Sequence, residues 1–338
     1  RVVQRIGIIG AGTMGGGIAM SFANAGIPVT LLDSSEEGLE KGIALIGKNY
    51  GVSVSKGKLS EHQAMEREAL ITGAVDYGKL ADVDLVIEAV FESMDVKRQV
   101  FSRLDEVCKQ GAILATNTSY LDVNEIAAST SRPQDVVGLH FFSPANVMRL
   151  LEVVKAESTS DEVVATAMAL GKRIGKVPVL AGVCYGFIGN RMLRQYAREA
   201  QLCMIEGAEP AQIDSVLMNF GMAMGPFRMY DVVGIDLEWR SRQLSGVQLP
   251  EGSPEELNVR VDNQLCEQER FGQKSGKGYY RYEKGSREAI VDESVEALIV
   301  ETSEKAGFTR RDISDEEIVD RCILALVNEG ATILEEGI

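Results

Sequence analysis

The chain has 338 residues, of which 45% are hydrophobic and 25% charged, and its net charge is −15 at neutral pH. The length favours two domains, and the acidic balance argues against a nucleic-acid-binding surface, which would need Lys and Arg to neutralise phosphates. No apolar run approaches the roughly 18 residues of a membrane span, no signal-peptide pattern opens the chain, and five scattered cysteines favour reduced thiols over disulfides or a zinc site, so we expect an intracellular protein.

The first 33 residues follow the order strand, glycine loop, helix, strand and acid. An apolar run over residues 5–9 leads into Gly10-Ala11-Gly12-Thr13-Met14-Gly15, and a second run over 28–32 ends in Asp33. In a dinucleotide-binding motif the first glycine permits a tight turn, the second lets the backbone approach the pyrophosphate, and the third lets the helix lie against the strand. The pyrophosphate then sits at the helix N-terminus, which needs no lysine to hold it.

Asp33 follows Gly12 by about 20 residues, the spacing at which a carboxylate accepts hydrogen bonds from the adenosine ribose hydroxyls and repels a 2′-phosphate. The sequence therefore predicts a Rossmann-type domain that binds NAD in preference to NADP. The predicted cofactor contacts in this segment are Gly10, Gly12, Thr13, Met14, Gly15 and Asp33.

Strand and helix patterns continue to alternate after Asp33. Residues 36–70 indicate two helices joined by a basic loop over 51–58, and buried-strand patterns at 84–90 and 111–117 flank a predicted helix over 93–107. Such alternation implies a parallel sheet, whose ligands collect beyond the carboxyl ends of the strands. Three polar residues lie just past predicted strand ends, where we expect the nicotinamide riboside: Glu92, Asn117 and Ser119.

A histidine and a glutamate interrupt two neighbouring apolar runs. His140 lies near the end of the run over 136–142, and Glu152 lies inside Leu150-Leu151-Glu152-Val153-Val154. One reversal of the chain would bring the imidazole against the carboxylate as a candidate catalytic pair. The alternative is a hydrogen-bonded core histidine, but a carboxylate flanked by Leu and Val needs a buried partner, which favours the pair. The other histidine, His62, lies in a polar segment and is interpreted as a surface residue.

The C-terminal half has a helical character. A helix over 160–174, a short strand over 177–180 and a long helix from Gly186 to Glu206 are followed mainly by helical patterns, so we place a domain boundary near Gly182. The glycine-rich segment 272–278 superficially resembles a phosphate-binding loop. Its glycine spacing is wrong and no Ser or Thr follows its second lysine, so we interpret it as a structural turn.

A weak internal repeat appears at an offset of 130 residues. Asn190-Arg191 aligns with Asp320-Arg321, Glu199 with Glu329, and Glu206-Gly207 with Glu336-Gly337. We therefore predict a nucleotide-binding domain over 1–182, a first helical repeat over 183–285, and the start of a second over 286–338. Because the second copy stops early and no initiator methionine precedes Arg1, we expect the chain to be part of a longer polypeptide.

Taken together, these motifs resemble the L-3-hydroxyacyl-CoA dehydrogenases of fatty-acid β-oxidation over nearly the whole chain. The glycine loop, Asn117-Thr118-Ser119, the segment 140–153 and Gly186-Phe187-Ile188-Gly189-Asn190-Arg191 occur in that family's order and spacing. The segment 140–153 is most similar to the dehydrogenase portion of multifunctional enzymes that also carry an enoyl-CoA hydratase domain. Ser143, where single-function members usually have Asn, favours the same branch.

The resemblance implies an α/β fold, with a Rossmann-type domain followed by an all-helical C-terminal domain whose second repeat is truncated. It implies NAD-dependent oxidation of L-3-hydroxyacyl-CoA to 3-ketoacyl-CoA, with a hydratase domain in the full-length chain and a thiolase as partner. The location implied is the bacterial-type cytoplasm or the peroxisome.

The resemblance also implies roles for individual residues. His140 would be the general base, Glu152 would orient it, and Ser119 and Asn190 would hydrogen-bond the reacting oxygen or the neighbouring acyl carbonyl. The remaining implied contacts are Glu92, Lys97, Asn117, Ser119 and Ser143 with the cofactor, and Lys56 with the CoA moiety.

Two other functions compete with this one. A dehydrogenase of small β-hydroxy acids would use a lysine as base and act on free acids. A non-catalytic member of the family would serve as a binding or structural protein, although the joint retention of His140, Glu152, Ser119 and Asn190 argues against that role.

Overall fold

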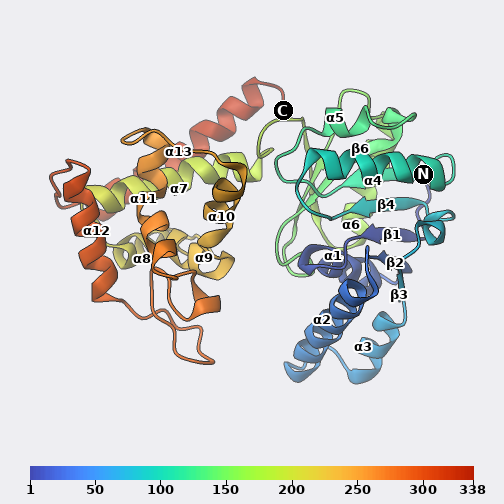
Figure 1. Cartoon of the computed structure of the whole chain (residues 1–338), viewed down its shortest axis with the longest axis horizontal. Coiled ribbons are helices and arrows are strands. Elements are labelled where there is room, and N and C mark those ends of the chain that lie inside the picture. The colour runs from blue at the N-terminus through green and yellow to red at the C-terminus, as the bar shows by residue number, and fades with distance from the viewer. The chain divides into compact units, whose positions relative to one another are not determined.

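The computed structural model describes residues 1–338, apart from the side chains of residues 244 and 245. It separates into two compact units, Arg1–Asn190 with Glu335–Ile338, and Arg191–Leu334 (Figure 1). The division falls later than the predicted boundary near Gly182. The segment before Asn190 stays with the first unit because Phe187 is fully buried in a small apolar cluster with side chains of the sheet.

The first unit is built on one eight-stranded sheet with the strand order β3-β2-β1-β4-β5-β6-β7-β8. Neighbouring strands are parallel except β6 and β7, which form an antiparallel pair. The sequence pattern does not predict β3, because its residues Ile-Thr-Gly-Ala form no continuous apolar run and none of them is buried. The strands are β1 (Ile6–Ile9), β2 (Val29–Leu32), β3 (Ile71–Ala74), β4 (Leu85–Glu88), β5 (Ile113–Thr116), β6 (Val136–Phe141), β7 (Leu150–Val154) and β8 (Val177–Ala181).

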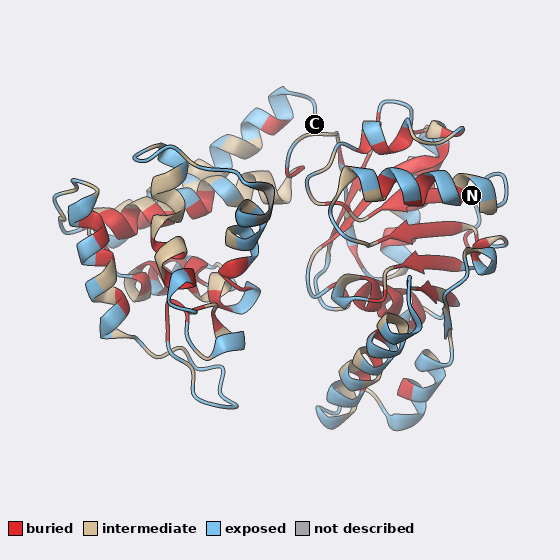
Figure 2. Ribbon diagram, viewed as in Figure 1, coloured by how far each residue is buried: buried red, intermediate tan, exposed pale blue. Residues whose placement is uncertain are grey.

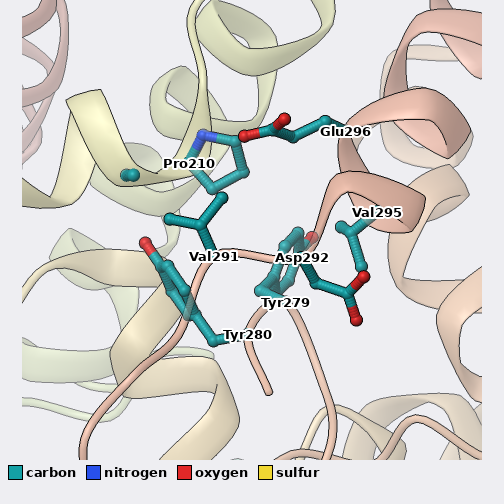
Figure 3. Close-up of a pocket in the computed structure, with 8 residues that line it drawn as sticks. Pro210, Tyr279, Tyr280, Val291, Asp292, Val295 and Glu296 are labelled. Carbon is teal, nitrogen blue, oxygen red and sulfur yellow. The ribbon is translucent and has the colours of Figure 1, made fainter.

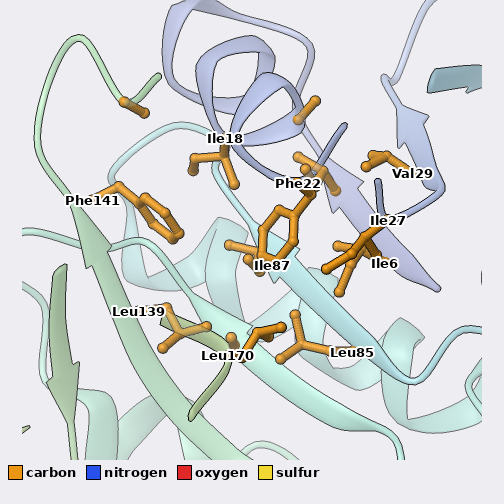
Figure 4. Packing of buried hydrophobic residues seen from close by; sticks show 14 of the residues in the cluster. Ile6, Ile18, Phe22, Ile27, Val29, Leu85, Ile87, Leu139, Phe141 and Leu170 are labelled. Carbon is orange, nitrogen blue, oxygen red and sulfur yellow. The ribbon is translucent and has the colours of Figure 1, made fainter. Parts of the chain in front are cut away.

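Helices cover both faces of this sheet, and its central strands are buried (Figure 2). On one face, Ile18 and Phe22 of α1 pack against strand side chains such as Ile6 and Ile87 (Figure 4). Side chains of α4 and α5 fill the core on the other face. The helices of this unit are α1 (Thr13–Asn24), α2 (Glu36–Ser55), α3 (Glu61–Glu68), α4 (Met94–Val107), α5 (Val123–Ala127) and α6 (Asp161–Arg173), with short 3₁₀ helices at Tyr77–Leu80 and Pro133–Asp135.

The predicted basic loop after α2 is shorter than expected. The helix continues to Ser55 and ends with Lys56 as its C-cap, so only part of the segment 51–58 is loop. Val54 packs against the core and the Ser53 hydroxyl donates to the Asn49 carbonyl, so tertiary and local contacts outweigh the weak helix propensity of Gly and Ser.

Alternation along β6 and β7 decides which side of the sheet carries the predicted pair. Leu139 of β6 and its cross-strand neighbour Val153 both face the core beneath α1. Because successive side chains of a strand point to opposite faces, His140 and Glu152 face the other side. They are also direct neighbours in the antiparallel register, so their side chains meet on one face.

The second unit is a helical bundle with its own apolar core. Its two longest helices, α7 and α13, carry the predicted internal repeat. Arg191 of the first copy pairs with Glu329 of the second, and Arg321 of the second pairs with Glu199 of the first at 3.0 Å. This reciprocal exchange is the pattern of two related helices that face each other. The helices are α7 (Gly189–Glu206), α8 (Pro210–Phe220), α9 (Pro226–Val233), α10 (Asp236–Ser245), α11 (Pro254–Glu267), α12 (Glu293–Lys305) and α13 (Asp315–Glu335), with a 3₁₀ helix at Gln273–Ser275.

The glycine-rich segment 272–278 is a structural turn, as predicted. Gly272 has a φ of +96°, and a Cβ on Gly278 would lie 1.9 Å from the Asp231 carboxylate. That carboxylate accepts hydrogen bonds from the backbone N–H groups of Tyr279 and Tyr280 and from the Tyr282 hydroxyl. The loop therefore wraps around a buried acid of its own unit.

Another buried acid in the helical unit gives the protein a predicted pH dependence. Asp262 accepts hydrogen bonds from Tyr279 and Gln201, and burial raises its pKa to about 7. Because this pKa lies above the unfolded value of about 4, the stabilising contribution is fully present below about pH 4 and is lost as the pH rises to about 7. Relative to the wild type, Asp262→Asn should therefore gain on the order of 2 kcal/mol of unfolding free energy between about pH 5 and pH 8.

Urea unfolding measures this difference in the helical unit, because the single tryptophan, Trp239, packs against the core of that unit. A stability difference between Asp262→Asn and the wild type that does not change with pH would contradict the assignment.

Candidate active site

The predicted histidine–glutamate pair is formed in the structure. The Nδ1 atom of His140 lies 2.6 Å from Oε2 of Glu152, and the two side chains are 4% and 1% exposed. An ionised carboxylate accepts from N–H, so this contact favours the tautomer with the proton on Nδ1. The other ring nitrogen, Nε2, then has a free lone pair with which to accept a proton.

The second oxygen of Glu152 is held by the start of α7. Its Oε1 accepts hydrogen bonds from the backbone N–H groups of Ile188 at 3.0 Å and Gly189 at 2.7 Å. Gly189 is the first residue of α7 and Ile188 directly precedes it, so both amides lie at the N-terminal end of the helix, where a negative charge is favoured. Side-chain patterns do not reveal a contact made by backbone amides. In the sequence, only the glycines of the adjacent segment Gly186-Phe187-Ile188-Gly189 indicate an unusual backbone here. In the structure, Phe187 has a φ of +47°.

Two aromatic rings enclose the imidazole. The ring of Phe142 lies 4.4 Å from that of His140 between centroids, and the ring of Phe187 lies 5.7 Å away. They limit the access of water to His140, and together with Glu152 they leave the ring little freedom to rotate. A base that is already oriented loses less entropy when it reacts.

The glycine loop has the shape that a dinucleotide requires. Gly10 has a φ of +97°, and a Cβ on Gly15 would lie 1.7 Å from the Gly10 carbonyl oxygen, so both positions need glycine. A Cβ on Gly12 would meet nothing within 4 Å, so the space beside this residue is open for a ligand. Gly12 is also the N-cap of α1, and Thr13 and Met14 follow as its first residues with unpaired N–H groups. This cradle fits the pyrophosphate of NAD.

Asp33 lies at the end of β2 beside this loop. Its Oδ2 accepts a hydrogen bond from the Ala11 N–H at 2.9 Å, so the carboxylate fixes the loop and is itself held in place. Partial exposure leaves it accessible to the adenosine ribose. The position matches the acid that binds the ribose hydroxyls in NAD-binding domains.

Replacing Asp33 by Ala is expected to weaken NAD about tenfold or more and to reduce the preference for NAD over NADP. The variant loses both the acceptor for the ribose hydroxyls and the charge that repels a 2′-phosphate. Asp33→Asn is the matched variant, because its amide oxygen can still accept from the Ala11 N–H while the charge is removed and the other oxygen is replaced by an NH2 group. Calorimetric titrations with both cofactors measure the effect, and an unchanged preference in both variants would remove Asp33 from the site.

The residues predicted around the nicotinamide riboside form a connected group. Glu92 is 37% exposed, and its Oε1 accepts hydrogen bonds from the Thr118 hydroxyl and from the N–H groups of Ser119 and Tyr120. Asn117 accepts from the Phe141 N–H and so ties the end of β5 to β6. These contacts arrange the loop that carries Ser119 at the carboxyl edge of the sheet.

Lys97, a predicted cofactor contact, lies next to two acids of the same unit. Its side chain is 0% exposed, and its ammonium lies 2.7 Å from Glu88 and 3.3 Å from Glu92. The ammonium therefore lies between two carboxylates, and the contact of Lys97 with the cofactor stays a prediction.

The other predicted residues are less closely linked to the pair. Asn190 is half-buried in the first turn of α7, next to the Gly189 amide that binds Glu152, while Ser143 is exposed in the turn between β6 and β7. Lys56 is exposed at the end of α2, and no hydrogen bond or ion pair among the described residues connects it to His140 or Glu152.

Two other kinds of site find no support. Within the part of the chain that the structure describes, no group of three or more His, Cys, Asp and Glu residues could hold a metal ion, and no helix is long and apolar enough to cross a membrane.

A hollow between Tyr280, Val291 and Val295 of the helical unit has a volume of about 10 Å³ (Figure 3). It has room for no more than one water molecule.

Comparison with known families agrees with this geometry. Residues 5–184 match the NAD-binding domain of 3-hydroxyacyl-CoA dehydrogenase, and residues 186–282 match the C-terminal domain of the same enzyme. The chain belongs to the 3-hydroxyacyl-CoA dehydrogenase family. The predicted resemblance, the Rossmann-type and helical domains, and NAD as the cofactor are thereby confirmed.

The relatives of this 3-hydroxyacyl-CoA dehydrogenase family member include larger enzymes. It is 44% identical over 347 residues to the peroxisomal bifunctional enzyme of Homo sapiens, a match that covers 100% of this chain and 48% of that protein. It is 37% identical over 339 residues to the fatty acid oxidation complex subunit alpha of Pseudomonas putida, with 99% and 47% covered. The chain thus spans about half the length of the curated relatives it matches.

A solved structure of the same family also matches. The dehydrogenase part of multifunctional enzyme 1 from C. elegans is 32% identical, with a TM-score of 0.74, and the match covers 100% of this chain and 75% of that one. The predicted likeness to multifunctional members of the dehydrogenase family is confirmed.

Proposed function

We propose that this chain oxidises L-3-hydroxyacyl-CoA to 3-ketoacyl-CoA with NAD, and that His140 is the general base. The observation that supports this most strongly is the 2.6 Å contact between His140 Nδ1 and Glu152 Oε2, which orients an imidazole in a unit that also carries an NAD-binding glycine loop. NAD, when bound, supplies the acceptor for the hydride that leaves C3 of the substrate.

His140 accepts the proton of the 3-hydroxyl on Nε2 as the hydride leaves C3. The imidazole becomes positively charged in this step, and the adjacent Glu152 carboxylate stabilises that charge without taking up the proton itself. Because Glu152 is held by the Ile188 and Gly189 amides, it keeps its position while the charge changes. Ser119 and Asn190 hydrogen-bond the reacting oxygen or the thioester carbonyl and fix C3 for transfer.

The proposed substrate, partners and location follow from the likeness to multifunctional members of the family. Acyl-CoA is the substrate, with Lys56 near its CoA moiety, and an enoyl-CoA hydratase domain in the full-length chain supplies the 3-hydroxyacyl-CoA by hydrating an enoyl-CoA. A thiolase consumes the 3-ketoacyl-CoA. The location is the peroxisome or a bacterial-type cytoplasm. The multifunctional relatives, of which this chain spans about half, support this arrangement.

An assay of NADH oxidation with two substrates tests the proposal. The chain should reduce acetoacetyl-CoA rapidly and acetoacetate hardly at all, and NADPH should replace NADH poorly. Preferential reduction of acetoacetate would identify a dehydrogenase of small acids. The absence of reduction with either substrate, in protein that binds NADH, would identify a non-catalytic member of the family.

A further inference from the structure

A fully buried ion pair lies beneath the loop that carries Ser119. Glu88 ends β4 and Lys97 lies on α4; both side chains are 0% exposed and their charged groups are 2.7 Å apart. Glu88 also accepts hydrogen bonds from the Thr116 hydroxyl at 2.9 Å and from the Val90 N–H at 2.6 Å. This carboxylate is therefore fully engaged, although neither the sequence motifs nor the proposed mechanism gives it a role.

Glu92, which is partly exposed, connects the buried ion pair to the surface. Lys97 lies 3.3 Å from Glu92 Oε2, and the other oxygen of Glu92 accepts hydrogen bonds from Thr118, Ser119 and Tyr120. The chain of contacts thus runs from β4 through α4 to the loop after β5. A displacement of Lys97 would release Glu92, and with it the backbone around Ser119.

The charges of this network do not balance. Two carboxylates face one ammonium, which leaves a formal charge of −1 with only Glu92 partly exposed. An interior of low polarity screens such a charge weakly, so its field reaches a neighbouring ligand. Oxidised nicotinamide carries a positive charge, whereas reduced nicotinamide is neutral, so the field acts on the two cofactor states differently.

We propose that Glu88 is a positioning residue, which holds Lys97 and through it Glu92 and the Ser119 loop, and that the net negative charge of Glu88, Lys97 and Glu92 favours oxidised over reduced nicotinamide. The inference rests on the proposed function for its cofactor site, but it concerns binding and not proton transfer.

The first test is Glu88→Gln, measured by calorimetric titration of the whole chain with NAD⁺ and with NADH. Glutamine has the same size and removes the charge. Its amide oxygen can still accept from the Val90 N–H, while its NH2 group can donate to the Thr116 hydroxyl. We expect the Kd for NAD⁺ to rise about tenfold more than the Kd for NADH. Glu125→Gln is the matched control, because Glu125 pairs with Arg98 of the same helix α4 at 2.8 Å but is half exposed. It should change neither constant, since exposed ion pairs contribute little.

The double variant Glu88→Gln/Lys97→Met separates the effect of the net charge from the effect of positioning Glu92. It restores the formal charge to −1 through Glu92 alone and leaves no unpaired buried ammonium, so it should fold even where Glu88→Gln does not. The ratio of the two Kd values should return towards that of the wild type, while both cofactors remain bound more weakly because Glu92 has lost its support.

Two results would overturn the proposal. One is an unchanged ratio of Kd values in Glu88→Gln, with only a lower unfolding temperature, which would make Glu88 purely structural. The other is a double variant with wild-type affinity for both cofactors, which would show that Lys97 does not position Glu92. A wild type that binds NAD but does not reduce acetoacetyl-CoA would refute the proposed function and leave this inference standing.

Discussion

Replacing His140 by Gln is expected to lower kcat for 3-hydroxyacyl-CoA oxidation by about 10³-fold, within the range that general bases contribute, while the Kd for NAD changes less than about threefold. The glutamine amide can still donate a hydrogen bond to Glu152 and fills similar space, so β6 and β7 should remain paired. It has no basic nitrogen to receive the proton of the 3-hydroxyl. Steady-state kinetics and calorimetry on the same preparation measure both quantities.

The chain provides its own control for this variant. His62 is the only other histidine in the sequence, and its side chain is 82% exposed on α3. His62→Gln should therefore leave both kcat and the Kd for NAD unchanged. If His140→Gln instead reduced NAD affinity and turnover equally, His140 would be a structural histidine of the sheet and not the base.

Replacing Glu152 by Gln is expected to lower kcat by about 10²- to 10⁴-fold. The amide that replaces Oε2 can present N–H groups to Nδ1, which favours the tautomer with its proton on Nε2, the atom that must accept the substrate proton. It also removes the negative charge that stabilises the imidazolium. The amide oxygen can still accept from Ile188 and Gly189, so the start of α7 should stay in place.

A nearby surface acid, Glu157, provides the control for Glu152→Gln. Glu157 follows β7 and is exposed, so Glu157→Gln should retain full activity. NAD affinity should be the same in Glu152→Gln as in the wild type, because the glycine loop is untouched. A Glu152→Gln enzyme with nearly normal kcat would mean that the carboxylate only fills a buried position.

The sequence predicts the features that depend on local patterns. The glycine loop and Asp33 form one continuous motif, and the two apolar runs around His140 and Glu152 leave the chain little choice but to pair them as neighbours. Gly10 and Gly15 have the backbone conformation and the close packing that the motif predicts, because both depend on the local backbone. The contact of Gly12 with the pyrophosphate stays a prediction.

Features that depend on tertiary contacts cannot be predicted from local sequence patterns. β3 carries no continuous apolar run, and α2 continues to Ser55 because Val54 finds a core to pack against. The burial of Lys97 depends on Glu88, a residue that appears in the sequence only as part of an apolar strand. The hydrogen bonds from the Ile188 and Gly189 amides to Glu152 cannot be predicted from side-chain patterns, because backbone groups make them.

The most direct test of the His140–Glu152 mechanism is a crystal structure of the chain with NAD⁺ and acetoacetyl-CoA. We expect Nε2 of His140 to lie within hydrogen-bonding distance of the C3 oxygen, with C3 facing C4 of the nicotinamide ring. A C3 oxygen bound to a lysine, or lying out of reach of His140, would contradict it.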